Sequence, residues 1–319
     1  MHTSEVLVRV EGLERRYGET LAVAGVSFEV HRGEVLGLLG PNGAGKSTAM
    51  QIIAGALAPS AGQVQIDGLD ILDHPIAAKG RIGYLPEQPP LYRELTVDEY
   101  LRYCARLHRV PRGEVAAALT RARERCGLEA MGHRLIGNLS KGYQQRVGIA
   151  QAIIHNPAVV ILDEPTVGLD PIQIREIRQL IRELGGEHSV ILSTHILPEV
   201  QAVCDRVQII HRGRLVLNED LKQLEARSEA ELLVRFTAPP AAAALEQLPG
   251  VARVEARDDG AFLLHLAAGA NPAPRMVEDA VAGGWGLVEL SPRRRTLEEI
   301  FVQLTAGDDG GHQTPEVAA

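Results

Sequence analysis

A glycine-rich segment, Gly40–Thr48, holds the residues with the clearest chemical role in this sequence of 319 residues. It fits the pattern G-x-x-x-x-G-K-[ST], in which backbone N–H groups of a turn and of the following helix surround phosphate oxygens. Lys46 is placed to reach the outer phosphates of a nucleotide, and Ser47 to bind Mg²⁺ through its hydroxyl. We therefore expect the whole loop to bind nucleotide: Gly40, Pro41, Asn42, Gly43, Ala44, Gly45, Lys46, Ser47 and Thr48.

Two neighbouring acids end a second apolar segment, Val159–Asp163. Asp163, at the tip of a buried strand, would hold Mg²⁺. Glu164 would point the other way in an extended chain, where it could polarise an attacking water as a general base. The alternative is a pair of solvated acids at a strand end, but the phosphate loop in the same chain favours a hydrolytic site.

Adenine is the expected base of the nucleotide. The guanine-reading motif N-K-x-D is absent, because no asparagine in the chain is followed by lysine. Tyr17 lies on a predicted turn and could stack on adenine, which is worth about 1–3 kcal/mol for bases elsewhere. The alternative for Tyr17 is a surface side chain that only fills the turn.

The elements that must position these residues alternate between strand and helix. Short apolar runs bounded by turn residues predict strands, and apolar residues at helical spacing predict helices. The expected strands are Val6–Val10, Val23–Val30, Glu34–Leu39, Gln63–Ile66, Ile82–Leu85, Ala158–Leu162, Val190–Ser193, Val207–Ile210 and Leu215–Leu217. Helices are expected after Lys46 to about Leu57, from Thr96 to about Asn138, and over Lys141–His155, Pro171–Leu184 and Leu197–Cys204.

This alternation predicts an α/β fold with a mainly parallel sheet, into which a helical subdomain of about residues 93–142 is inserted. The first domain is expected to span residues 1–224. Residues 225–306 show the order β-α-β-β-α-β and predict a small α+β domain of ferredoxin-like type. The Gly/Asp-rich tail 307–319 is expected to be disordered.

Composition narrows the function further. The formal net charge of −8 argues against binding to nucleic acid, which favours basic domains. Three scattered cysteines, Cys104, Cys126 and Cys204, favour a reduced, cytosolic protein without disulfides or a zinc site. No signal peptide and no apolar run long enough to span a bilayer are apparent, so a membrane role would require another chain to do the spanning.

A third motif, Leu139–Arg146, stands just before the helix that leads to Asp163. Together with the phosphate loop, the acid pair and a later histidine, it makes residues of about Val6–Arg214 resemble the ATP-binding cassette (ABC) ATPases. Their signature is L-S-G-G-Q; Ser140 and Gly142 match it, whereas the residues at 141 and 143 depart from it. The resemblance implies that Ser140 and Gly142 contact the γ-phosphate of an ATP held by the opposite subunit. An ordinary helix capped by Ser140 is the alternative, and both can hold.

Further residues take their expected roles from the same resemblance. It implies that His195 contacts the γ-phosphate, and that the Asp170 segment crosses a dimer interface. The family's metal- and water-sensing glutamine falls on Glu87 here, with Gln88 beside it. We favour Glu87 as a metal ligand by position, and Gln88 stays the alternative.

Several segments resemble ATPase subunits of ABC-2-type exporters: Gly83–Glu87, Ser140–Arg146, Thr166–Pro171 and Arg294–Leu304. The resemblance implies ATP hydrolysis with Mg²⁺ by a homodimer, or by a pair with a second cassette, joined through the ATP sites. It also implies a separate polytopic membrane permease and a peripheral position on the cytoplasmic face of the membrane. The rival functions are a soluble ABC ATPase of DNA repair or translation, and a non-catalytic nucleotide-binding regulator.

Overall fold

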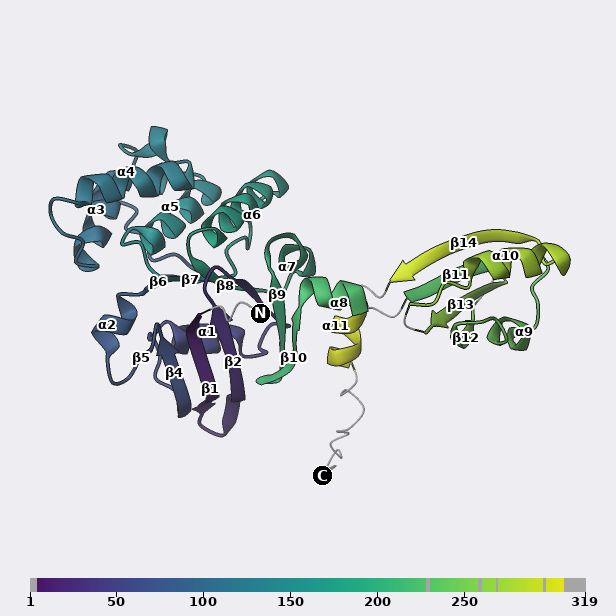
Figure 1. Ribbon diagram of the computed structural model, residues 1–319. Coiled ribbons are helices and arrows are strands. Elements are labelled where there is room, and N and C mark those ends of the chain that lie inside the picture. The colour runs from purple at the N-terminus through teal and green to yellow at the C-terminus, as the bar shows by residue number, and fades with distance from the viewer. Residues whose placement is uncertain (1–4, 228–229, 258–259, 268, 295–296, 307–319) are drawn as a thin grey trace, which may run out of the picture. The chain divides into compact units, whose positions relative to one another are not determined.

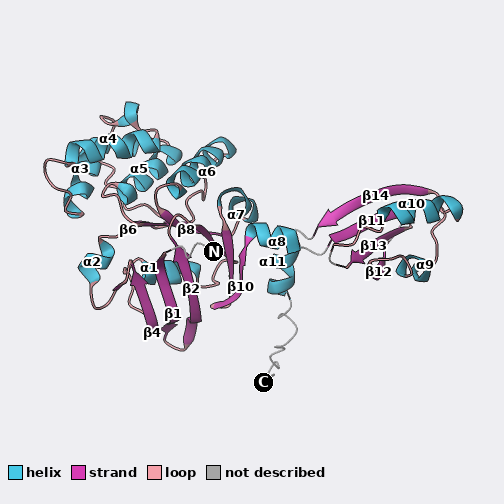
Figure 2. Ribbon diagram, viewed as in Figure 1, coloured by secondary structure: helices cyan, strands magenta, loops and turns pink. Residues whose placement is uncertain are grey.

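The computed structural model describes residues 5–227, 230–257, 260–267, 269–294 and 297–306 (Figures 1 and 2). The chain divides into two compact units, Met1–Leu221 and Lys222–Ala319. The tail 307–319, for which disorder was predicted, lies outside the described residues.

A six-stranded sheet in the order β10-β9-β3-β8-β7-β6 forms the centre of the first unit. Neighbouring strands run parallel except for the antiparallel pair β9–β10. The strands are β3 (Val35–Leu39), β6 (Ile82–Leu85), β7 (Val159–Asp163), β8 (Ser189–Thr194), β9 (Arg206–His211) and β10 (Arg214–Asp220). The predicted mainly parallel sheet is therefore confirmed.

Both faces of this sheet are covered, which explains the continuous apolar sequences of β3 and β7. Val160 and Leu162 belong to a core shared with helices α5 (Lys141–Ile153) and α6 (Pro171–Gly185). Val159 and Ile161 belong to a second core shared with α1 (Lys46–Ile53). Alternate residues of one strand thus enter opposite cores, as the two-residue period of a strand dictates.

A second, antiparallel sheet in the order β2-β1-β4-β5 packs in the same core as α1. Its strands are β1 (Val6–Tyr17), β2 (Thr20–His31), β4 (Ala61–Ile66) and β5 (Leu69–Asp70). The sequence predicted most of these strands but not that they form a sheet of their own. Pairing between strands distant in sequence leaves no local signal beyond the alternation of apolar residues. The division of the strands into two sheets was therefore not predicted.

The helical subdomain contains α3 (Val97–Leu107) and α4 (Val115–Cys126). A capping box begins α3, because the Thr96 hydroxyl accepts from the Glu99 N–H while the Glu99 carboxylate accepts from the Thr96 N–H. The prediction of helix as far as Asn138 was wrong. Gly127, at a φ of 63°, caps α4, and two short 3₁₀ turns follow (Glu129–Met131 and Ile136–Asn138).

The remaining helices of the first unit are short. They are α2 (Pro75–Lys79), which the sequence did not predict, and α7 (Leu197–Val203). A further helix that was not predicted, α8 (Leu221–Arg227), spans the boundary between the units.

The second unit has the predicted β-α-β-β-α-β order, and its sheet order β12-β13-β11-β14 with antiparallel neighbours is that of a ferredoxin-like fold. Its core includes Phe236, Phe262 and Met276. Its elements are β11 (Ala230–Phe236), α9 (Ala242–Glu246), β12 (Val251–Ala256), β13 (Ala261–Leu266), α10 (Ala273–Ala282), β14 (Leu287–Arg294) and α11 (Leu297–Ala306).

Two stacked imidazoles make the stability of the first unit sensitive to pH. His155 lies parallel to His108, with ring centroids 3.7 Å apart, and its Nε2 faces the Ile82 carbonyl at 3.0 Å. Burial, the neighbouring His108 and more distant His188 lower the pKa of His155 from 6.5 to about 4. The unfolded chain therefore binds a proton between these pH values that the folded chain does not, so stability falls as pH falls through that window.

We expect the His155→Gln variant to lose much less stability than the wild type as the pH falls. The wild type should lose about 2 kcal/mol of unfolding free energy through this residue between about pH 7.5 and 5. Urea unfolding of both proteins across that range measures the difference. His74→Gln, at an exposed histidine, is the control; an equal pH dependence in the His155 variant and the wild type would contradict the assignment.

Candidate functional site

The loop Gly40–Thr48 joins the end of β3 to the start of α1, as the sequence predicted. Gly45 precedes the helix at a φ of 105°, and a Cβ there would lie 2.3 Å from the Ala22 carbonyl oxygen, so only glycine fits. No side chain caps the first turn of α1. Its first N–H groups and the positive end of the helix dipole therefore suit a bound anion.

A cavity of about 420 Å³ opens at this loop. Its lining brings together most of the predicted phosphate loop and three residues distant in sequence, Glu87, Glu164 and His195. The other lining residues are Ala22, Asn42, Gly43, Ala44, Gly45, Lys46, Ser47, Thr48 and Val167. Ala22 and Val167 were not predicted, because only the folded chain brings their segments against the loop.

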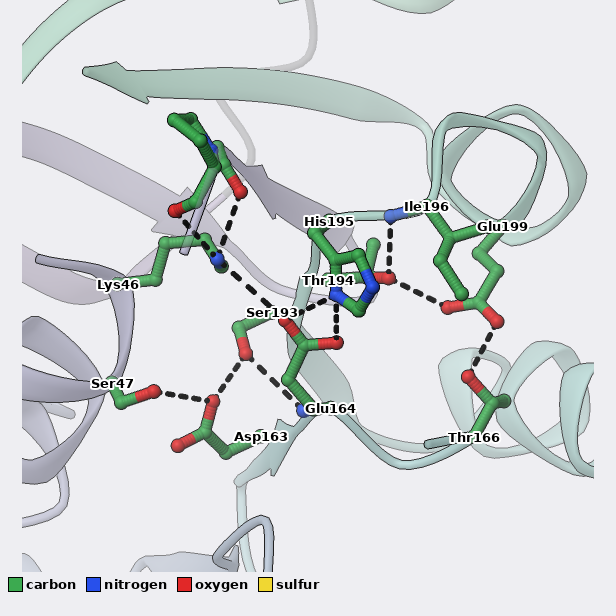
Figure 3. A network of polar contacts seen from close by, with 12 residues as sticks. Lys46, Ser47, Asp163, Glu164, Thr166, Ser193, Thr194, His195, Ile196 and Glu199 are labelled. Atoms are coloured by element: carbon green, nitrogen blue, oxygen red, sulfur yellow. Dashed lines mark hydrogen bonds and ion pairs between the residues drawn. The ribbon is translucent and has the colours of Figure 1, made fainter. Parts of the chain in front are cut away.

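Lys46 is buried, with 5% of its side chain exposed. Its Nζ donates to the carbonyl oxygens of Gly40 at 2.8 Å and of Pro41 at 3.3 Å. The same Nζ lies 3.6 Å from Oε1 of Glu164 (Figure 3). The ammonium group thus has carbonyl and carboxylate partners that compensate for its removal from water.

Asp163 ends β7 and is 2% exposed. Its Oδ1 accepts from the Ser47 hydroxyl at 3.2 Å and also from the Ser193 hydroxyl (Figure 3). Burial and the charge of Asp163 raise the pKa of Tyr84, on the neighbouring strand β6, to about 12, so that its phenol stays neutral. The oxygen donors of Ser47 and Asp163 suit a hard divalent cation such as Mg²⁺.

Glu164 and His195 face each other across the ends of β7 and β8 (Figure 3). The His195 Nδ1 lies 2.9 Å from Oε2 and 3.1 Å from Oε1 of Glu164. The expectation that Glu164 continues an extended chain was wrong, because its φ of 47° is left-handed. Its N–H donates to the Ser193 carbonyl at 3.1 Å, which holds this turn, and such a backbone is typical of functional sites.

A second polar network, which the sequence did not predict, lies beside this pair. The carboxylate of Glu199, on α7, accepts hydrogen bonds from the hydroxyls of Thr166 and Thr194 (Figure 3). All three side chains are buried. Their types and spacing resemble ordinary surface residues, so the linear sequence carried no signal for the network.

Six predicted site residues do not line the cavity. Gly40, Pro41 and Asp163 adjoin residues that do. The other three, Tyr17, Ser140 and Gly142, lie on other segments. Tyr17 is 46% exposed on the β1–β2 hairpin, and the Arg15 guanidinium carbon lies 4.8 Å from its ring centroid. Ser140 caps α5 by accepting from the Tyr143 N–H at 3.4 Å. Gly142 is buried against the Gln173 side chain.

The two candidates for the sensor position differ in location. Glu87 lines the nucleotide cavity, whereas Gln88 lines only a neighbouring cavity of about 540 Å³. Glu87 also lines that second cavity, together with Lys141 and Gln144 from the start of α5. The location of Glu87 between the two cavities favours it over Gln88.

Comparison with known proteins agrees with this geometry. Residues 23–167 match the ABC transporter family. The bacitracin transport ATP-binding protein BcrA of Bacillus licheniformis is 32% identical over 304 residues, which cover 94% of this chain and 98% of BcrA.

Two solved structures share the fold of the first unit. CbiO1 from Clostridium perfringens, part of the ABC transporter complex CbiONQ, is 32% identical with a TM-score of 0.63; the match covers 70% of this chain and 92% of CbiO1. The dimeric cassette MJ0796, in a post-hydrolysis state bound to ADP and Pi, is 26% identical with a TM-score of 0.61; the match covers 67% of this chain and 99% of MJ0796.

The chain that carries the phosphate loop, the acid pair and the opposed histidine thus matches BcrA over nearly its whole length. ATP hydrolysis is the general activity of this family. This chain belongs to the ATP-binding proteins of ABC transporters and is an ATPase of that family.

Proposed function

We propose that this chain powers an ABC-2-type exporter as one of two cassettes that close around ATP. The observation that supports this proposal most directly is the convergence of Lys46, Glu164 and His195 at one cavity, with Asp163 hydrogen-bonded to Ser47 in its lining. These residues end or follow three parallel strands, β3, β7 and β8, so the fold itself sets their spacing.

ATP would bind with its phosphates against the loop N–H groups and Lys46. The Lys46 ammonium would then exchange its carbonyl and Glu164 partners for phosphate oxygens. Its hydrogen bonds would be charge-assisted both before and after this exchange. Adenine would stack on Tyr17, where Arg15 lies against the ring and limits stacking to the opposite face.

Mg²⁺ would be held by the Ser47 hydroxyl and the Asp163 carboxylate, with Glu87 as a further oxygen ligand. Ser47 and Asp163 already lie within 3.2 Å of each other, and Glu87 lines the same cavity. When bound, the ion neutralises charge that develops on the phosphate oxygens.

Glu164 would act as the general base. Its carboxylate would accept the proton of a water that attacks the γ-phosphorus, while the bond to the ADP oxygen breaks. His195 would contact the γ-phosphate and hold the Glu164 carboxylate in place, as their separation of 2.9 Å supports. Loss of the γ-phosphate would remove the contacts that favour closure.

A second chain would complete each site with its Ser140 and Gly142. Both residues lie at the start of α5 and outside the nucleotide cavity of their own chain, and Ser140 is exposed. The dimeric form of MJ0796 supports a pair of cassettes. A head-to-tail homodimer, or a pair with a second cassette, satisfies this requirement.

The membrane-spanning part would be a separate polytopic permease, with this chain peripheral on the cytoplasmic face. In the part of the chain that the structure describes, no helix has the length and apolar character to cross a bilayer. The membership of CbiO1 in a transporter complex supports such a partner. The relatives do not favour a soluble repair ATPase, and the complete acid pair and His195 argue against a non-catalytic regulator.

We expect Lys46→Ala to weaken ATP binding by about 10-fold or more, because a charge-assisted contact to the phosphates is lost. Isothermal titration calorimetry measures the dissociation constant. Lys79→Ala, on α2 outside the cavity, is the matched control. An unchanged ATP affinity in Lys46→Ala would remove the assigned role of this lysine.

Glu164→Gln should bind ATP but hydrolyse it about 10²–10⁴-fold more slowly, since the amide cannot accept the proton of the water. It should also accumulate a closed dimer with ATP. Phosphate release and analytical ultracentrifugation test the two effects, with the exposed Glu183→Gln as control. Near-normal turnover would rule out Glu164 as the base.

Mixing two inactive variants tests whether the sites are shared between chains. Lys46→Ala spoils the nucleotide cavity, and Ser140→Arg spoils the surface that completes the partner's site. A mixed head-to-tail dimer contains one site in which both halves are intact, so the mixture should regain ATPase activity that neither variant has alone. No gain on mixing, although mixed dimers form, would show that Ser140 does not act across the interface.

A further inference from the structure

Glu199 is a carboxylate in the interior, with 1% of the residue exposed. It lies in the first turn of α7, and the expected site does not include it. Burying an ionised carboxylate is costly unless its oxygens have strong partners. The hydrogen-bond and ion-pair partners of Glu199 therefore indicate the role of this buried carboxylate.

Each oxygen of Glu199 has a different hydroxyl partner. Oε1 accepts from the Thr166 hydroxyl, and Oε2 accepts from the Thr194 hydroxyl at 2.7 Å. An Arg178 guanidinium nitrogen, from α6, lies 3.7 Å from Oε1 and supplies the compensating charge. The carboxylate is thus satisfied on both sides, as a buried polar network requires.

The two threonines belong to the two segments that carry the proposed chemistry. Thr166 lies two residues after Glu164, and Thr194 immediately precedes His195. The Thr194 hydroxyl also accepts from the Ile196 N–H at 3.0 Å, which holds the chain on the far side of His195. Figure 3 shows the Glu199 carboxylate between the two threonine hydroxyls.

We propose that Glu199 is a positioning residue that fixes Glu164 relative to His195 by joining the segments after β7 and β8. The ends of β7 and β8 do not by themselves fix the positions of these two side chains. Glu164 lies beyond β7 in a left-handed turn, and His195 lies one residue beyond β8. A carboxylate suits this task because its two oxygens can hold two hydroxyls at a set separation. The proposal rests on the proposed roles of Glu164 and His195.

Paired threonine variants test the proposal with little change in volume. Thr166→Val and Thr194→Val lose the hydroxyl, whereas Thr166→Ser and Thr194→Ser keep it. Displacement of a reacting group by about 1 Å costs up to about 100-fold in rate. We expect each valine variant to lower kcat by about 10-fold or more, with the ATP dissociation constant within about twofold of wild type. The serine variants should stay close to wild type.

A half-buried ion pair away from the site serves as a control that separates an effect on stability from an effect on positioning. Glu34 and Arg206 form such a pair, with 12% and 17% of their side chains exposed. Glu34→Gln should lower the melting temperature while leaving kcat near the wild-type value. If the threonine variants behave in the same way, with stability lost and kcat kept, the network is only structural and the proposal is overturned.

Combination with His195→Ala provides a second readout. Once the imidazole is absent, the Thr194 hydroxyl no longer has a histidine side chain to position. Thr194→Val should therefore reduce kcat much less in the His195→Ala background than in wild type. Full additivity of the two effects would also overturn the proposal. Turnover that survives in both Glu164→Gln and His195→Ala would instead disprove the proposed catalytic roles, so the two failures are distinguishable.

Discussion

The parallel register of β3, β8 and β7 is the constraint on which the site depends. Leu39 pairs with Thr194, and Asp163 pairs with Ser193, so the three strands end at the same edge of the sheet. The phosphate loop begins after the first of these strands, Asp163 ends β7, and Glu164 and His195 directly follow β7 and β8. Loops that follow parallel strands meet at this edge, which is where ligands of open α/β sheets bind.

Charged groups at that edge are buried and depend on one another. The Lys46 ammonium and the Glu164 carboxylate are each more than nine-tenths buried and lie 3.6 Å apart. Each compensates for the desolvation of the other, and Glu164 has His195 as a further partner. A ligand with phosphate oxygens offers Lys46 replacement partners and frees Glu164 for other contacts. Removing either partner would therefore leave the other as a buried charge with fewer partners.

Local chemistry made several elements and roles predictable from the sequence. The Thr96–Glu99 box marked the start of α3, because a capping side chain reaches only a few residues along the chain. The order of elements in the second unit was likewise readable from their individual periodicities. The end of the helical block was not, since Gly127 and the following 3₁₀ turns interrupt a segment whose apolar spacing still resembles a helix.

The sequence by itself determined which residues can hold phosphate, because loop glycines, a lysine and a hydroxyl act together within nine consecutive positions. An apolar run also pointed to Asp163 and Glu164, whereas the expected role of His195 came from the resemblance to the ABC ATPases. Only the tertiary structure decided that Glu87 lines the cavity, that Glu164 turns into a left-handed backbone, and that Glu199 joins the two segments beside it. These facts depend on pairing and packing between segments far apart in the chain, for which no local pattern exists.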